Sequence, residues 1–249
     1  MDIYAFGPIA AVLDAAYGAM TWLAAALEPL TGSAAAAAAV VAVTILVRVA
    51  LVPVGISQAR AEQTRARLAP RLRALHTRHR KDPERLQRET MNLYREENTS
   101  PFAGCMPVLL QAPIVGVLYT LFLRTEIAGH ANALLSQDLW GATLGTGLVH
   151  MLFAGPFSMP TLLVSGGLLA IMLAVAETSR RAFRPVAVDD SPLASPGMVR
   201  VMGGLHYLTA VFAVFVPLAA ALYLAVTVSW TLVQRVVLRR RFPLPTSAC

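Results

Sequence analysis

The sequence AAAAAAVVAVTILVRVALVPVGIS occupies residues 34–57 and decides the class of this protein. Apart from Thr44, Arg48 and the last residue, it is apolar. A helix needs about 20 consecutive apolar residues to cross the hydrocarbon of a bilayer, and this run is long enough. We therefore predict a membrane-spanning helix over 34–57, bent near its end by Pro53.

Four more apolar runs follow this helix and set the fold class. Hydrophobic residues make up 56% of the 249 residues and charged residues only 14%, against about a quarter in ordinary soluble domains. Mean hydropathy is +0.59. A soluble core does not need several apolar runs of membrane-spanning length, so we predict an all-α, polytopic membrane protein with a core of five transmembrane helices. The further predicted spans are residues 101–124, 158–178, 200–216 and 217–235.

An amphipathic segment precedes the first span. Within residues 1–33, apolar side chains recur at helical spacing on one face, while Asp14 and Glu28 lie on the other. Such a helix is suited to lying in the membrane interface, and Asp14 near its middle argues against a sixth span. The segment lacks a basic beginning, so we expect no cleavable secretory signal.

Residues 58–100 change the character of the chain completely. Eleven of the 21 Lys and Arg fall here, and Lys81-Asp82-Pro83 has the composition of a turn with proline at the start of a helix. Helices over 58–79 and 83–97, joined by this turn, predict a helical hairpin in water. Its positive charge makes it a candidate docking surface for an acidic partner; the alternative is a solvated loop beside anionic lipid.

The positive charges predict the orientation in the membrane. No Lys or Arg lies before Arg48 or between Arg124 and Arg180. Cytoplasmic loops carry the excess of Lys and Arg, so we predict a multi-pass plasma-membrane protein with its N-terminus outside and its C-terminus cytoplasmic. The predicted cytoplasmic segments are the hairpin at 58–100, the loop at 179–199 and the basic tail at 236–249, and the predicted extracytoplasmic loop is 125–157.

Arg48 is the most informative residue of the first span. It lies about nine residues, or roughly 13 Å along a helix, from the predicted cytoplasmic end of that span. A charge at such depth costs at least a few kcal/mol against lipid. The side chain is therefore expected to face the bundle interior or a water-filled cavity. A structural ion pair with Glu177 is the alternative interpretation.

A polar groove inside the bundle needs further polar side chains, and the second and fifth spans supply them. Each has a plain structural alternative, because Ser and Thr bond back to their own helix, Gln bridges helices and Trp anchors at the interface. We expect no catalytic residue, cofactor or metal ion, and Cys105 and Cys249 form no metal-binding or disulfide pattern. The predicted groove residues are Arg48, Gln111, Tyr119, Trp230, Thr231 and Gln234.

Residues 68–119 carry a family likeness. They read LAPRLRALHTRHRKDPERLQRETMNLYREENTSPFAGCMPVLLQAPIVGVLY. The charged part contains Pro70-Arg71-Leu72, Lys81-Asp82-Pro83 and Leu93-Tyr94, and a Pro-x-x-Gly-Cys-x-Pro-x-x-x-Gln-x-Pro pattern over 101–113 opens the second span. With this spacing, the stretch resembles the YidC/Oxa/Alb family of membrane protein insertases, as a short bacterial member of the YidC type.

The resemblance implies a function and a set of partners. Such proteins insert and fold nascent membrane proteins, alone or beside the Sec translocon, through a hydrophilic groove that needs no enzymatic chemistry. Arg48 matches the groove arginine of the family, and Trp230 is matched to a groove aromatic on the fifth helix. The hairpin at 58–100 is then expected to meet the Sec translocon, the ribosome or a targeting factor. The chain departs from many relatives in that its third span is nearly all apolar over 160–176.

Two other classes of protein compete with an insertase. A small secondary transporter would use Arg48 for an anionic solute, but it should show internal repeats or interrupted helices around a midplane site, and the sequence has neither. A membrane-anchored scaffold would recruit a partner through the hairpin alone. That leaves Arg48 unexplained, because a plain anchor does not need a charge within the membrane.

Overall fold

The computed structural model describes residues 7–97, 106–127, 129–183 and 196–243, with the side chains of 106–114, 196–203 and 205 left undescribed. This part of the chain is mostly helical and contains no closed sheet. The helices are α1 (Gly7–Thr31), the 3-10 turn η2 (Gly32–Ala34), α2 (Ala35–Ala50), α3 (Val52–Arg78), α4 (Pro83–Glu96), α5 (Met106–Leu123), α6 (Leu148–Phe153), α7 (Met159–Ala182), α8 (Pro196–Ala213) and α9 (Leu218–Arg241). The strands are β1 (Glu126–Ile127), β2 (His130–Ala131), β3 (Asp138–Leu139) and β4 (Ala142–Thr143).

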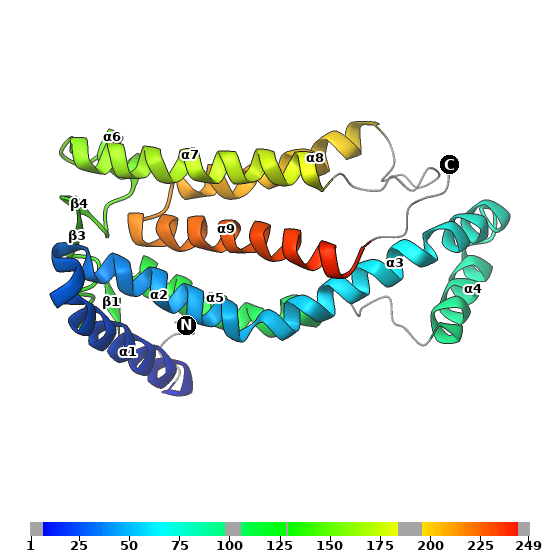
Figure 1. Ribbon diagram of the computed structural model, residues 1–249, viewed down its shortest axis with the longest axis horizontal. Coiled ribbons are helices and arrows are strands. Elements are labelled where there is room, and N and C mark those ends of the chain that lie inside the picture. Colours follow the sequence, from blue (N-terminus) through cyan, green and yellow to red (C-terminus); the bar gives the residue numbers. More distant parts are fainter. Residues whose placement is uncertain (1–6, 98–105, 128, 184–195, 244–249) are drawn as a thin grey trace.

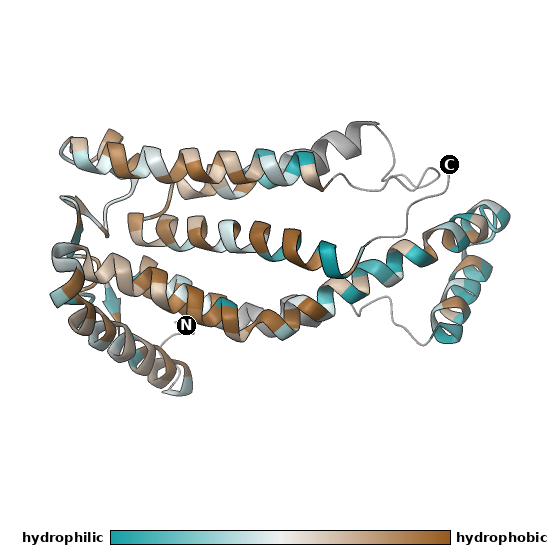
Figure 2. Ribbon diagram, viewed as in Figure 1, coloured by the Kyte–Doolittle hydropathy of each residue, from teal (hydrophilic) through white to brown (hydrophobic). Residues whose placement is uncertain are grey.

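The long helices form a bundle from which α3 and α4 project. Helix α9 packs against α2 on one side and against α7 on the other, and α8 packs beside α7 (Figure 1). Figure 2 shows the bundle as mainly hydrophobic, whereas α4 and the distal part of α3 are largely hydrophilic. Three runs of the described residues are long and apolar enough to cross a membrane: Gly7–Ala50, Met159–Ala182 and Leu218–Arg241. The count of five spans therefore stays a prediction.

Helix α1 folds back along α2 instead of continuing into it. Gly32 has a φ of +56°, a left-handed conformation that glycine adopts without steric cost, and the chain reverses there. The turn places Leu13, Met20 and Ala24 of α1 in the hydrophobic core. The opposite face of α1 is exposed and carries Asp14 and Glu28, as its sequence predicts, together with the apolar Trp22.

The predicted boundary at residue 57 falls inside α3. The Leu51 N–H donates to Val47 O at 3.0 Å, and the Gly55 N–H donates to Leu51 O at 3.1 Å, so helical hydrogen bonding continues from α2 into α3. Pro53 lies in the first turn of α3, where it has no N–H to donate to a carbonyl of α2. The apolar span and the first basic helix follow one path that bends where α2 passes into α3 (Figure 1), as the sequence predicts from Pro53.

Helices α3 and α4 pack against each other. The Asp82 carboxylate accepts a hydrogen bond from the Arg85 N–H at 3.0 Å and caps α4, as short polar side chains commonly do. Arg67 and Arg71 of α3 both donate to Glu97 at 2.7 Å, just beyond the end of α4. Leu68 and Leu93 are buried between the helices.

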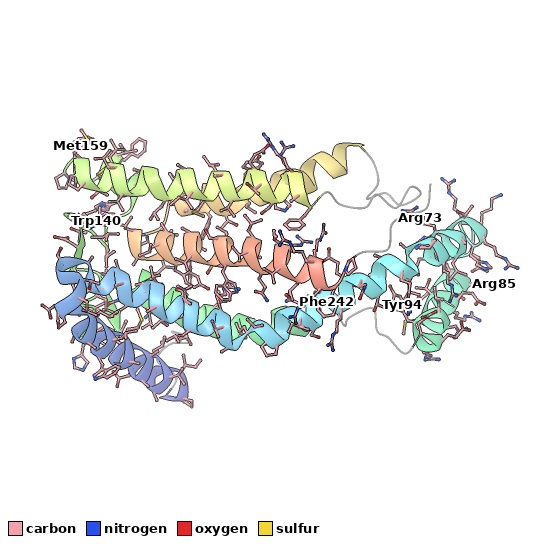
Figure 3. The ribbon with its side chains drawn as sticks, in the orientation of Figure 1. Arg73, Arg85, Tyr94, Trp140, Met159 and Phe242 are labelled. Atoms are coloured by element: carbon pink, nitrogen blue, oxygen red, sulfur yellow. The ribbon has the colours of Figure 1, made fainter. Side chains whose placement is uncertain are left out.

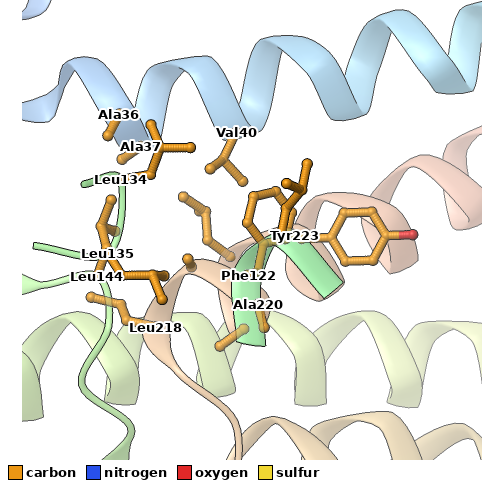
Figure 4. Close-up of a cluster of buried hydrophobic side chains, with 14 of the residues drawn as sticks. Ala36, Ala37, Val40, Phe122, Leu134, Leu135, Leu144, Leu218, Ala220 and Tyr223 are labelled. Atoms are coloured by element: carbon orange, nitrogen blue, oxygen red, sulfur yellow. The ribbon is translucent and has the colours of Figure 1, made fainter. Parts of the chain in front are cut away.

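The segment predicted as a loop at 125–157 contains two small hairpins and α6. Strands β1 and β2 pair antiparallel, as do β3 and β4. The N–H groups of Leu218 and Ala219, at the start of α9, donate to Thr146 O at 3.2 Å and Leu144 O at 2.9 Å. In Figure 4, leucines of this segment lie among buried side chains of α2, α5 and α9. The segment thus closes the end of the bundle opposite the α3–α4 pair.

Candidate functional site

A cavity of about 340 Å³ lies between the α2–α3 path and α9. The lining residues on α9 start at Thr231 and recur every three or four positions. Those on the α2–α3 wall start at Arg48 and have the same spacing, so each wall is one face of a helix. Because α3 continues the path of α2, that stripe extends well past the predicted end of the first span. The lining residues are Arg48, Leu51, Val54, Gly55, Gln58, Ala59, Glu62, Thr231, Gln234, Arg235, Leu238, Arg239 and Phe242.

Arg48 lines the apolar end of this cavity and is only partly exposed. Its guanidinium lies beside the phenol of Tyr223, a residue of α9 that is itself buried. The Tyr223 ring packs on Phe122 of α5, with ring centroids 5.9 Å apart. The charge predicted to avoid lipid therefore faces the bundle interior, which is the arrangement that its desolvation cost demands.

Gln234 of α9 lies opposite Gly55 of α3 in the cavity wall. The Trp230 indole N–H donates to Gln234 Oε1 at 2.9 Å. The amide nitrogen of Gln234 meets Gly55, where a Cβ atom would lie only 1.7 Å from Gln234 Nε2. Any residue larger than glycine at position 55 must displace this amide, the end of a flexible side chain, so Gly55 is what lets the Gln234 amide lie against α3.

Glu62 connects α3 to the basic end of α9. Its Oε1 accepts hydrogen bonds from Arg235 at 3.0 Å and Arg239 at 3.2 Å. Burial alone would raise the pKa of Glu62, but the charges and hydrogen bonds of Arg235 and Arg239 outweigh burial and hold the pKa below its ordinary value. The same two guanidinium groups lie 4.6 and 4.4 Å from the centre of the Phe183 ring, which follows α7. Three helices therefore meet at one cationic cluster.

The structure brings together only part of the predicted groove. Arg48, Thr231 and Gln234 line the cavity, and Trp230 touches it through Gln234. Tyr119 instead stacks on Phe212 of α8, with ring centroids 6.1 Å apart, and the side chain of Gln111 lies outside the described part of the structure.

The alternative partner proposed for Arg48 is engaged elsewhere. Glu177 accepts hydrogen bonds from Arg180 at 2.7 and 2.8 Å, and also from Arg181 and Tyr207. Arg180 and Arg181 lie one turn further along α7, and Tyr207 lies on α8. The interpretation of Arg48 as an ion-pair partner of Glu177 is therefore wrong, because local arginines take both carboxylate oxygens.

Sequence reasoning missed Glu62, Arg235 and Arg239. The sequence pattern places Glu62 in the charged hairpin at 58–100, Arg235 at the end of the fifth predicted span and Arg239 in the basic tail. The signal that could have found Glu62 is its spacing: residues 48, 51, 55, 58 and 62 recur at three or four, the repeat of one helix face. This repeat crosses the assumed boundary at 57 without interruption.

The sequence is similar to a described protein family and to several named proteins. The family described as 60Kd inner membrane protein matches residues 26–245. Membrane protein insertase YidC of Clostridium perfringens (strain 13 / Type A) is 39% identical over 97 residues, which cover 39% of this chain and 40% of that protein. Membrane protein insertase YidC of Streptomyces avermitilis is 24% identical over 219 residues, which cover 82% of this chain and 51% of the relative. The chain thus spans about two fifths to one half of these relatives.

Proposed function

The chain belongs to the 60Kd inner membrane protein family, and we propose on this basis that it is a membrane protein insertase. The observation that supports a specific site is the cavity between α2–α3 and α9, with Arg48 at its apolar end. The relatives that carry the name membrane protein insertase support the same activity. We propose the cavity as the place where a polar segment of a substrate enters the membrane.

The mechanism is a reduction of desolvation cost. A short polar tail crossing hydrocarbon must give up its hydrogen bonds to water, at a cost of several kcal/mol for each unsatisfied group. Gln58, Thr231 and Gln234 offer polar side chains in the cavity wall. They can replace part of that hydration while the apolar helix of the substrate moves sideways into lipid by hydrophobic partition.

The charge of the cavity favours an acidic tail. Its lining holds three arginines, Arg48, Arg235 and Arg239, against one carboxylate, Glu62, for a formal charge of +2. Glu62 is bonded to Arg235 and Arg239, whereas Arg48 lies beside the phenol of Tyr223. We propose Arg48 as the group that attracts acidic residues of the substrate.

The orientation follows from the position of the basic helices. We propose that α3 and α4 lie in the cytoplasm with the C-terminal basic tail, and that the segment at 125–157 lies outside. The cavity residues nearest the chain's C-terminal basic run, Arg239 and Phe242, then lie at the cytoplasmic end. Helices α3 and α4, with exposed arginines such as Arg85, are the proposed docking surface for the Sec translocon, a ribosome or a targeting factor.

Depletion and rescue tests the proposed function. Cells depleted of their own insertase receive this chain or its Arg48→Ala variant at equal membrane levels, and protease protection scores the insertion of a single-span protein with an acidic tail. Arg240→Ala is the matched control, because Arg240 is an exposed arginine outside the cavity lining. We expect rescue by the wild type and by Arg240→Ala, and failure of Arg48→Ala. No rescue by a well-expressed wild type contradicts the insertase, and rescue by all three removes Arg48 from its mechanism.

A further inference from the structure

Trp140 occupies the tip of the β3–β4 hairpin in a conformation that bulky residues rarely adopt. Leu139 pairs with Ala142, which leaves Trp140 and Gly141 as a two-residue turn with φ values of 52° and 82°. Two positive φ values are characteristic of a type I′ turn, whose first position favours Asn, Asp or Gly. Among the described residues other than glycine, Trp140 alone has a positive φ.

Packing within the protein does not compensate for this strain. Trp140 is 75% exposed, so a large apolar ring stands away from the core on a hairpin that an asparagine would close more easily. A strained residue persists where something outside the local geometry favours it. We therefore expect a partner outside the protein chain to cover the Trp140 indole.

Trp140 belongs to a larger exposed surface, which we call the aromatic patch. The hairpin tip lies against the start of α7, since a Cβ atom on Gly141 would be 3.5 Å from the Pro160 ring. Figure 3 shows Trp140 and Met159 at the same end of the molecule, away from Arg73 and Arg85. The patch consists of the exposed residues Trp140, Leu152, Phe153, Phe157 and Met159.

The chemistry around the patch fits lipid. Residues 139–176 contain no Asp, Glu, Lys or Arg, so nothing there matches a charged protein partner. The patch continues into the outer face of α7, where Leu163 and Ile171 are exposed on a helix suited to span a membrane. The 24 residues of α7 extend roughly 36 Å, beyond the about 30 Å of hydrocarbon, which puts the start of α7 at interface level.

We propose that the aromatic patch is a lipid-binding surface, with the Trp140 indole inserted between the headgroups and upper acyl chains of the bilayer leaflet at this end of the bundle. Tryptophan is enriched at this depth because its ring is apolar and its N–H is polar. The patch carries no charge, so it takes zwitterionic and anionic phospholipids alike. In the orientation proposed above, the leaflet is the outer one, and the inserted ring holds the segment that closes the bundle against the membrane surface.

Fluorescence quenching locates the indole. The chain has three tryptophans, and Trp22→Phe with Trp230→Phe leaves only Trp140. One copy of this protein is placed in each nanodisc, and the nanodiscs are made of phosphatidylcholine that is brominated either near the headgroup or near the end of the acyl chain. We expect emission from Trp140 to be quenched most by shallow bromines and little by aqueous iodide. The control adds Arg85→Trp to a background in which Trp22, Trp140 and Trp230 are all Phe, because Arg85 lies at the far end of the molecule. If Trp140 behaves like this control, with iodide quenching and no bromine quenching, the proposal is wrong.

A turn substitution separates lipid binding from internal packing. Trp140→Asn supplies a residue that the type I′ turn favours, so we expect it to unfold in detergent at the same temperature as the wild type or a higher one. In nanodiscs, a nitroxide label at Ser136 on the same segment should gain mobility in Trp140→Asn but not in Trp140→Phe. A large loss of thermal stability in detergent for Trp140→Asn would show that the indole serves the fold instead of the lipid. Unchanged label mobility in Trp140→Asn would contradict the lipid anchor.

Discussion

Glu62 Oε1 on α3 lies 3.0 Å from Arg235 Nη2 on α9, although 173 residues separate the two in the sequence. Arg239 reaches the same oxygen from one turn further along α9. The carboxylate therefore joins the first basic helix to the last helix at the mouth of the cavity that Arg48 also lines. Movement of α3 away from α9 has to break these bonds.

The contribution of this pair can be measured by a double-mutant cycle. We expect Glu62→Gln and Arg235→Gln to show a coupling of about 0.5–1 kcal/mol in the free energy of unfolding, because side chains that are about 40% exposed are screened by solvent. Chemical unfolding of the purified protein in detergent gives the four values. Additive effects of the two substitutions would mean that the pair does not hold α3 to α9.

The same pair makes stability depend on pH. The folded-state pKa of Glu62 lies below its ordinary value of 4.5, so its contribution is fully present above that value and is lost as pH falls through the lower folded pKa. We expect the stability difference between wild type and Glu62→Gln to be constant near neutral pH and to shrink below about pH 4.5. A difference that stays constant throughout acid titration would contradict this assignment.

Gly55 is expected to tolerate no side chain while Gln234 keeps its place. Gly55→Ala puts a Cβ atom 1.7 Å from Gln234 Nε2. The flexible amide can turn away, so the expected cost is that of the lost bond from Trp230, about 1 kcal/mol. Thermal unfolding in detergent measures the loss. Gly166→Ala is the control, because nothing lies within 4 Å of its Cβ position.

A shorter side chain at position 234 should relieve that clash. We expect the double variant Gly55→Ala, Gln234→Ala to lose less stability than the two single variants lose together, since the alanine methyl then fills space that the amide leaves. If the effects of the two substitutions on stability are strictly additive, the Gln234 side chain is not the reason that position 55 requires glycine.

The charge at position 48 should decide which substrates are inserted. Arg48→Lys retains a cation and should insert acidic-tailed substrates at a reduced but substantial rate, whereas Arg48→Glu should fail with them because like charges repel. Arg48→Glu should still insert a substrate whose tail is neutral. Protease protection of a matched pair of substrates, differing only in tail charge, provides the measurement. Equal insertion of both substrates by Arg48→Glu would overturn the electrostatic account.

The sequence alone determined the membrane class, the amphipathic face of α1, the helical character of 58–79 and 83–97, and the inward position of Arg48. These features follow from local patterns, since hydropathy, helical spacing and the cost of a charge in lipid depend on neighbours along the chain. The family resemblance was also visible in the sequence, because the spacing over 68–119 is a local property, and the family match over residues 26–245 bears it out.

Only the tertiary structure decided which polar groups meet. By sequence, Glu62 is one of many charges in a soluble hairpin, but the continuation of α2 into α3 directs it toward Arg235. By sequence, Glu177 is available to Arg48, but its hydrogen-bond partners lie on α8 and on its own helix. Tyr119 packs on Phe212 and stands outside the cavity. The physical reason is that a side chain's partner depends on the packing angle and depth of helices far apart in sequence, which no local pattern specifies.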